Sequence, residues 1–277
     1  NRTICIRRAA FKADYVLRCD ADFILEVEDE EFKSKLVGDS YLVDINGDYL
    51  LDVLHKSDLN WYYKGRTHEC ADSDSINADV ICLEGIRYTT TYDGWNRAIK
   101  WERDLELLKL DLEDNPLDSR TNFYLGQTYD ETGNYELAVE HFKTCAQYTH
   151  SPEEGYVALI RIARITQSSS DYFQAIDYRP QRHEAYVELS KKYIEEHRYL
   201  MGYIISKIGI EIGRCEDTLF YQWDKENWIL YDINSFSCWH VGKKEEGKNH
   251  LKYLLEGDIV PLSERERLEN NLKTYDN

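Results

Sequence analysis

The sequence predicts a chain of two parts, a mixed α/β portion over residues 1–92 and an all-α array of helical hairpins over residues 93–277. Three observations support this division. Short β-prone runs bounded by turn residues gather in the first part. Apolar residues at helical spacing fill the second part. Within the second part, a residue pattern recurs after 34 residues, which indicates a repeat architecture.

The first part begins with strand signals. Tyr15-Val16-Leu17 is apolar and β-prone, and it leads into the acidic cluster Asp20-Ala21-Asp22. Residues 41–43 and 49–54 flank Asn46-Gly47, which is a strong hairpin signal. A further strand is predicted over residues 80–83. These elements predict a sheet whose first strand presents carboxylates at its C-terminal end.

The second part begins with a long helix whose apolar residues share one face. These residues are Trp101, Leu105, Leu108 and Leu112, which are four, three and four positions apart. The pattern predicts a helix that ends before Asn115-Pro116. We place the domain boundary at residue 92, where this helical texture begins.

The repeats match the tetratricopeptide pattern. The first copy consists of Leu125, Gly126, Tyr129, Gly133, Tyr135, Ala138, Phe142 and Pro152. A second copy starts at Leu189 and Tyr193, with the same offsets of 6, 9 and 13 after the tyrosine. The copy between them is four residues short near residues 166–171, which predicts either a tight variant or a missing loop. Residues 242–254 resemble a degenerate terminal repeat, as expected for a cap.

Composition excludes several classes of function. With 42% hydrophobic and 31% charged residues, the chain resembles a soluble globular protein. The net charge of -18 argues against binding to nucleic acid. No apolar run approaches the roughly 20 residues of a membrane span. Seven scattered cysteines without a CxxC pair indicate a reducing, cytoplasmic compartment. Because Asn1-Arg2-Thr3 runs quickly into a segment that we expect to be an apolar strand, we also expect an upstream segment.

Two clusters in the first part could carry chemistry. Asp20 and Asp22 are two residues apart, so both can face one metal ion from an extended strand end, although a solvated strand end is the plain alternative. The second cluster joins the aromatic Trp61 and Tyr63 to His68-Glu69. The aromatic faces suit stacking on sugar rings or bases, but each residue could equally belong to the core.

The two clusters together resemble family 2 GT-A glycosyltransferases, particularly bacterial and large-virus members that carry tetratricopeptide repeats. The segments that carry the resemblance are Ala13 to Asp22, Trp61 to Glu69, Lys100 to Asp104 with Asn115-Pro116, and Tyr178 to Ala185. The resemblance covers nearly the whole chain. It implies a GT-A, Rossmann-like fold for the first part and a bacterial or viral origin.

By this resemblance, the chain is an inverting glycosyltransferase. Asp20, Asp22 and His68 would hold Mn²⁺ or Mg²⁺ against the diphosphate of a nucleotide sugar, such as a UDP-sugar. Glu69 would be the base that accepts a proton from the acceptor hydroxyl. The acceptor would be a glycan, a protein or a small molecule. Arg2, Trp61 and Tyr63 would contact the donor or the acceptor.

The sequence also departs from the family pattern. Phe23 stands where the family has a third acidic residue, and half of the expected nucleotide-binding region is absent before Asn1. Two alternatives therefore stay open. One is a non-catalytic tetratricopeptide module that binds a protein partner and carries a degenerate glycosyltransferase remnant. The other is a metal-dependent phosphohydrolase that uses the same carboxylates.

Overall fold

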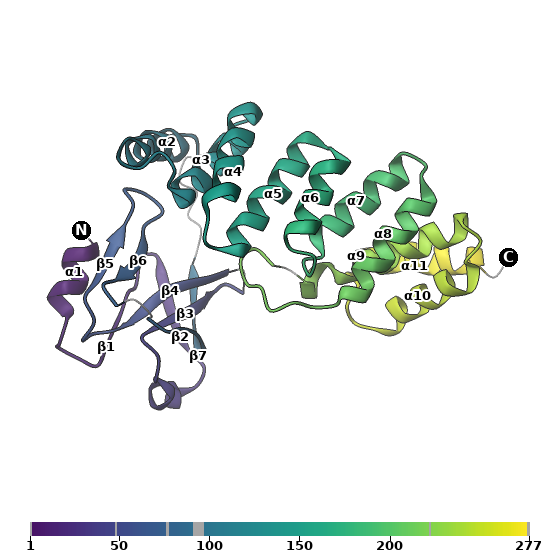
Figure 1. Cartoon of the computed structure of the whole chain (residues 1–277). Helices are drawn as coiled ribbons and strands as arrows, with labels where there is room; N and C mark the ends of the chain where they lie inside the picture. The colour runs from purple at the N-terminus through teal and green to yellow at the C-terminus, as the bar shows by residue number, and fades with distance from the viewer. Residues whose placement is uncertain (1, 48, 76–77, 91–96, 222, 276–277) are drawn as a thin grey trace. The chain divides into compact units, whose positions relative to one another are not determined.

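A computed structural model of the chain describes residues 2–47, 49–75, 78–90, 97–221 and 223–275 (Figure 1). The chain divides into two compact units, unit 1 from Asn1 to Asn134 and unit 2 from Tyr135 to Asn277. The boundary predicted at residue 92 lies outside the described residues. No described helix combines the length and the apolar character that a membrane crossing requires.

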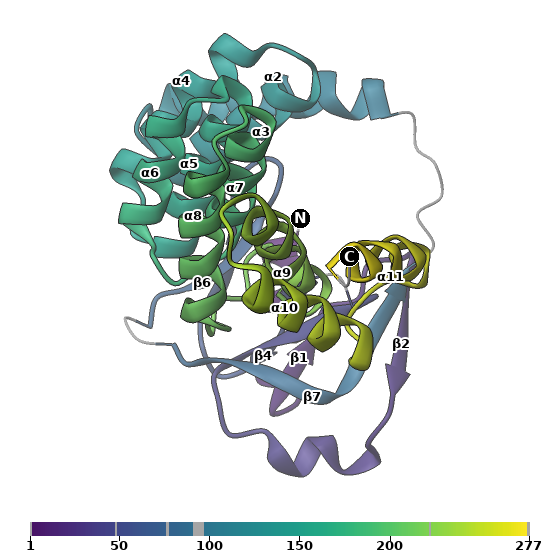
Figure 2. The same ribbon diagram turned by 90° about the vertical axis from the view of Figure 1, so that its right-hand side faces the viewer.

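Unit 1 is built on a five-stranded sheet with the strand order β1-β4-β3-β7-β2. In chain order its elements are α1 (Arg2–Ala9), β1 (Tyr15–Leu17), β2 (Phe23–Val27), the 3-10 helix η1 (Glu30–Lys35), β3 (Ser40–Ile45), β4 (Tyr49–Lys56), β5 (Trp61–Lys64), β6 (Cys70–Ser73), β7 (Val80–Thr90), α2 (Arg97–Asp114) and α3 (Ser119–Glu131). Strands β5 and β6 form a separate hairpin. Figure 2 shows β2 at the margin of the large sheet, next to β7.

The sheet contradicts the predicted GT-A, Rossmann-like fold. Strand β4 runs antiparallel to both β1 and β3, and β2 runs antiparallel to β7, so β3 and β7 form the one parallel pair among the described strands. Parallel strands need crossovers of roughly a dozen residues or more. Asn46 and Gly47 instead reverse the chain directly between β3 and β4, with φ of 56° and 72°. The α/β fold prediction is therefore wrong in its topology.

The core of unit 1 follows from strand alternation. Val43 and Ile45 on β3, Val53 on β4 and Tyr88 on β7 are all fully buried and belong to one apolar cluster. Residues two apart on a strand point to the same face, so these side chains meet on one side of the sheet. Tyr88 also donates a hydrogen bond to the carbonyl of Arg18, at 2.7 Å. This bond ties β7 to the segment that follows β1.

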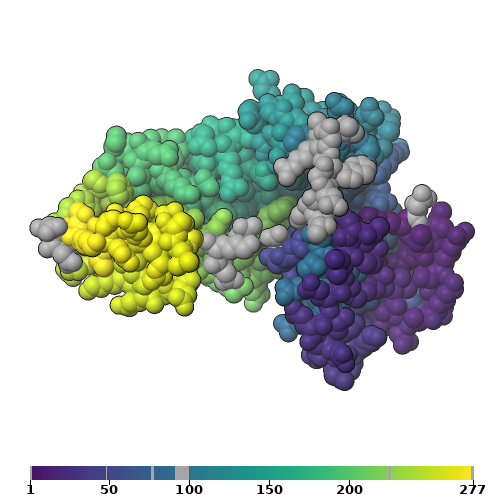
Figure 3. Space-filling model, turned by 180° about the vertical axis from the view of Figure 1, so that it is seen from behind, coloured from purple at the N-terminus to yellow at the C-terminus, as the bar shows by residue number. Residues whose placement is uncertain are grey.

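Unit 2 is a series of antiparallel helices. They are α4 (Tyr135–Tyr148), α5 (Pro152–Thr166), α6 (Ser169–Tyr178), α7 (Glu184–Glu195), α8 (Tyr199–Ile212), α9 (Trp223–His240), α10 (Lys244–Glu256) and α11 (Leu262–Tyr275). Each helix packs against the next, and α7 also contacts both α5 and α9. Helices α5, α7 and α9 therefore form a row in which each helix contacts the next, and we call this row the inner row. Figure 3 shows the last helices, drawn in yellow, as a continuous block, and its core includes Leu251, Leu254 and Leu268.

The short middle repeat is the tight variant. Helix α6 has ten residues, whereas α4 and α8 have 14. A two-residue turn joins α5 to α6, and Gln167 adopts the left-handed conformation there, with φ of 54°. Its backbone N–H donates to the carbonyl of Ala163 and so closes the end of α5. The four missing residues are thus accounted for by a shortened second helix after a sharp turn.

Candidate functional site

Arg2 brings two of the predicted site residues together. Its guanidinium lies 3.1 Å from a carboxylate oxygen of Asp20 and 3.2 Å from one of Glu69. Helix α1 supplies Arg2, the connection after β1 supplies Asp20, and Glu69 immediately precedes β6. The predicted base and one predicted metal ligand therefore share a single cation from the same chain. Asp22 is exposed in the connection between β1 and β2.

His68 makes its contacts with the helices of unit 1. Its ring stacks on Tyr124 of α3, with centroids 3.9 Å apart. Its Nε2 atom lies 3.8 Å from a carboxylate oxygen of the buried Asp104 on α2. Burial lowers the pKa of His68 to about 4, so the imidazole is neutral at pH 7. The preceding residue, Thr67, donates to Asp104 at 3.0 Å.

These contacts belong to the docking of the β5–β6 hairpin on helices α2 and α3. Arg66, beside His68, pairs with Asp111 at 2.6 Å and with Asp114 at 2.8 Å. Its backbone N–H also donates to Asp111, at 3.0 Å. Arg120 donates to the carbonyl of His68. The hairpin segment that was expected to carry chemistry therefore holds unit 1 together.

No metal centre forms at the predicted position. Across the part of the chain that the structure describes, no group of three or more His, Cys, Asp or Glu side chains could hold a metal ion. This finding corrects the expectation of a metal-binding motif in unit 1. The physical reason is that the imidazole of His68 is engaged by α3. His68 has φ of 49°, a left-handed conformation, and its ring stacks on Tyr124.

Trp61 and Tyr63 are part of the packing of unit 1. The side chain of Trp61 is buried, its ring lies 4.7 Å from that of His55, and its indole N–H donates to the carbonyl of Lys56. Tyr63 is half-buried under the guanidinium of Arg18. A buried indole ring has no face to offer a sugar. Trp61 is therefore a core residue of unit 1, which is the alternative to sugar stacking that the sequence left open.

The structure also reveals a buried polar network that sequence reasoning missed. The hydroxyl of Ser40 on β3 lies 2.9 Å from Nδ1 of His55 and donates to Asp52, both on β4. Burial raises the pKa of Asp52 to about 6 and lowers that of His55 to about 4. Ser40 and His55 are fully buried. Because no substrate can reach the hydroxyl, the network is a polar link between two strands.

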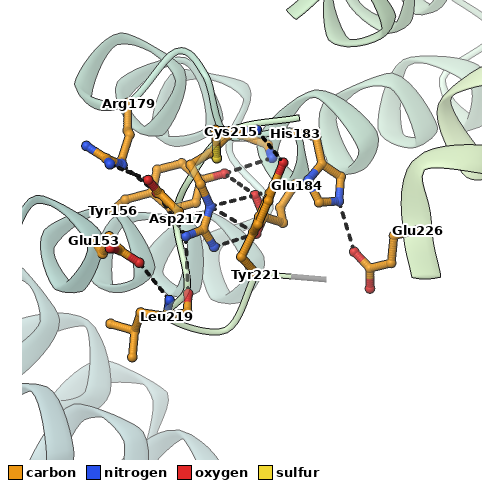
Figure 4. Close-up of polar contacts among 12 residues, drawn as sticks. Glu153, Tyr156, Arg179, His183, Glu184, Cys215, Asp217, Leu219, Tyr221 and Glu226 are labelled. Carbon is orange, nitrogen blue, oxygen red and sulfur yellow. Dashed lines mark hydrogen bonds and ion pairs between the residues drawn. The ribbon is translucent and has the colours of Figure 1, made fainter. Parts of the chain in front are cut away.

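Figure 4 shows Tyr156, Glu184, Asp217 and Tyr221 close together in unit 2. They belong to a second cluster that sequence reasoning missed, which surrounds the buried Arg182. Its side chain is 1% exposed and makes a two-pronged pair with the carboxylate of Glu184. It also lies 3.2 Å from Asp217, while the rings of Tyr156 and Tyr221 lie 4.7 and 5.0 Å from its guanidinium carbon. A buried charge needs such pairing, because desolvation alone is unfavourable.

The cluster fastens the long connection between α8 and α9 onto α5 and α7. Asp217, in this connection, also accepts two hydrogen bonds from Arg179. The carboxylate of Glu153 on α5 accepts from the backbone N–H groups of Thr218 and Leu219 (Figure 4). The charges of the two arginines are matched within the cluster. Its sequence signal is the density of charged residues between α6 and α7, but only the fold shows that they are buried.

The inner row of unit 2 carries charged side chains that connect neighbouring helices. Arg164 of α5 lies 3.5 Å from Glu188 of α7. The buried His183, before α7, pairs with Glu226 of α9 at 3.2 Å. The pKa of Glu226 is lowered by this hydrogen bond and by the charges of Arg164 and Lys191. Lys191 on α7 is exposed. The row therefore carries paired charges of both signs, and Lys191 is an exposed cation on it.

Unit 2 consists of paired antiparallel helices, and the first helix of each pair contacts the first helix of the next, which defines unit 2 as a helical-repeat array. Similar solved structures include MamA, with 18% identity over 58% of this chain and 90% of MamA, at a TM-score of 0.44. TTC0263, a thermophilic TPR protein of Thermus thermophilus, shares 19% identity over 64% of this chain and 93% of TTC0263, at a TM-score of 0.37. YrrB, described as a TPR protein with an unusual peptide-binding site, shares 13% identity over 64% of this chain and 86% of YrrB, at a TM-score of 0.42.

No protein-family model matches the chain, and no curated protein matches it either. The antiparallel strand pairs correct the resemblance to family 2 GT-A glycosyltransferases, because that resemblance implied a Rossmann-like sheet. The expected sugar-transfer activity and its nucleotide-sugar donor are withdrawn with it.

Proposed function

We propose that the chain is a protein-interaction module and that unit 2 binds an extended segment of another protein along the row of α5, α7 and α9. The observation that carries the proposal is the contact of α7 with both α5 and α9. Such a row forms a continuous surface, and stacked helical repeats use surfaces of this kind for binding. Figure 1 shows the three helices in neighbouring positions.

The charges of the row favour a partner segment that carries acidic residues. The exposed side chains of Arg164 and Lys191 lie close enough to lower the pKa of Glu226. The carboxylate of Glu226 is engaged by His183, and that of Glu188 by Arg164. The ammonium group of Lys191 is exposed to solvent. Complementary charge sets the orientation and the association rate of such a complex more than its affinity.

Site-specific photocrosslinking tests this proposal. A photoreactive residue replaces Lys191 on the row, and in a matched control it replaces Phe173, which is 42% exposed on the second helix α6. We expect defined protein adducts from position 191 that disappear when Arg164→Glu is added. Equal adducts from position 173, or none from position 191 in the correctly folded chain, would reject the row as the binding surface.

A further inference from the structure

Within the described residues of unit 1, strand β2 is an open edge of the sheet. Strand β7 pairs with one side of β2, and β2 is the last strand in the sheet order. Three apolar side chains on it are exposed: Ile24 by 60%, Leu25 by 37% and Val27 by 48%. Edge strands of folded proteins are normally short, charged or covered, because their unpaired backbone groups can accept another strand. This edge is apolar over most of its length.

The backbone of β2 is suited to such pairing. The N–H of Glu28 donates to the carbonyl of Gly85 at 2.8 Å, so the backbone at residue 28 points toward β7. Hydrogen-bonding direction alternates along an antiparallel strand. The backbone groups of Leu25 and Val27 are therefore directed away from β7, toward the open side. They would form the ladder with an added strand.

Charge identifies the kind of partner. Seven acidic and two basic residues lie between positions 20 and 35. Some of the acids are paired: Arg87 contacts Glu26 at 3.2 Å and Glu28 at 2.6 Å. Asp22 at one end of the strand and Glu30 beyond the other end are exposed. An added strand with basic ends would place opposite charges next to both.

The same acids disfavour a second copy of this chain as the occupant. An antiparallel β2 pair centred on Leu25 places Asp22 opposite Glu28. A pair centred on Ile24 places Asp22 opposite Glu26, and one centred on Glu26 places that residue opposite itself. Like charges directly opposite each other destabilise a strand pair. The net charge of -18 adds to this repulsion.

We propose that β2 binds an extended segment of another protein as an additional strand, with alternating apolar residues at its centre and basic residues at its ends. The open backbone groups provide the hydrogen bonds, and Ile24, Leu25 and Val27 provide the apolar contacts. This surface lies in unit 1 and is distinct from the helical row of unit 2, so either proposal can fail without the other.

A labelled peptide, Lys-Arg-Val-Thr-Val-Thr-Val-Arg-Lys, tests the inference by fluorescence anisotropy with the full chain. We expect saturable binding that weakens by roughly fivefold or more in Leu25→Lys, since that change removes an apolar contact and adds a repulsive charge. Val37→Lys is the matched control. Val37 is 80% exposed on a loop of the same unit, and its substitution by lysine adds the same charge as Leu25→Lys. We expect the control to bind as the wild type does.

Two altered peptides separate strand addition from simple charge attraction. The same peptide with its five central amides N-methylated keeps its charge but cannot pair, and we expect no saturable binding. The peptide with Glu in place of its four basic residues should also fail. Ile24→Lys, at a 60% exposed position, repeats the test should Leu25→Lys fail to fold.

Three results of the peptide measurements would overturn the inference. They are an absence of peptide binding, full binding of the N-methylated peptide, and an equal loss of binding in Val37→Lys. Sedimentation gives a further test. If the chain forms a dimer and Leu25→Lys dissociates it, the inference is overturned, because the occupant of the β2 edge would then be a second copy.

Discussion

The imidazole of His68 lies parallel to the ring of Tyr124, with an interplanar angle of 7° and 3.9 Å between the ring centroids. This contact joins the end of the β5–β6 hairpin to helix α3 within unit 1. The buried Asp104 of α2 lies on the same imidazole, 3.8 Å from Nε2. His68 thus contributes to the packing of the hairpin in its neutral form.

The neutral state of His68 predicts a pH dependence of stability. Its pKa is lowered by burial to about 4, against roughly 6.5 in the unfolded chain. The unfolded state therefore binds more protons between these values, and stability falls as the pH drops from about 6.5 to 4. His68→Phe keeps an aromatic ring for the stack but cannot titrate.

We expect the difference in unfolding free energy between wild type and His68→Phe to be constant above about pH 7.5 and to move in favour of the variant below pH 6.5. Urea denaturation at a series of pH values measures this difference. Because Asp52 and His55 titrate in both proteins, their contributions cancel in the comparison. Parallel stability curves across the whole range would contradict the role assigned to His68.

The Arg182 cluster predicts a large loss of stability on removal of its central cation. Arg182→Met leaves Glu184 buried without its partner, which costs about 3 to 5 kcal/mol of unfolding free energy. Arg198→Met is the matched control, because Arg198 also lies over a tyrosine ring, at 4.4 Å, but is 52% exposed. The control should lose about 1 kcal/mol or less. Similar losses in chemical denaturation of the two variants would show that the buried cluster is unimportant.

Close helix packing predicts opposite outcomes for two glycine substitutions in unit 2. A Cβ atom at Gly209 on α8 would lie 2.9 Å from the Cβ of Tyr186 and from a methyl group of Leu230. Since Tyr186 cannot retreat without moving its backbone, Gly209→Ala should destabilise by about 1 to 3 kcal/mol despite its better helix propensity.

Gly155→Ala on α5 is the companion to this substitution. Its new Cβ would meet the phenol end of Tyr178, which is 41% exposed and can rotate away. The variant should be neutral or more stable by up to about 1 kcal/mol, because alanine favours the helix. Thermal unfolding of both variants measures the contrast. A stable Gly209→Ala protein would refute the tight approach of α8 to α7 and α9.

The tight turn between α5 and α6 predicts a stabilising substitution. Gln167 has φ of 54°, a region that costs most residues roughly 1 to 2 kcal/mol and glycine little. Gln167→Gly should therefore raise the unfolding free energy by up to about 1 kcal/mol. Gln167→Val should lower it, because a β-branched residue tolerates this conformation poorly. The opposite order of stabilities in denaturant titrations would exclude the left-handed turn.

Local residue patterns predicted part of the secondary structure of this protein, although the apolar segment after Asn1, expected to be a strand, is the helix α1. The spacing of Leu125, Tyr129 and Tyr193 predicted helices, and the described residues from Arg97 onward form the helices α2 to α11. Asn46-Gly47 predicted the hairpin between β3 and β4. Such patterns are informative because a helix or a strand buries residues at a fixed period, and the period can be recognised without knowing the partner.

Which elements and which charges meet depends on the folded arrangement of the chain. Strand order depends on how the chain reverses, and nothing in the spacing of Tyr15 to Leu17 indicates β4 as its neighbour. His68 turned toward Tyr124 because the hairpin docks on α2 and α3, and Arg182 is buried because the α8–α9 connection returns across α5 and α7. These contacts join residues far apart in sequence. Their free energies arise from burial and charge pairing in the folded chain, which local residue types do not specify.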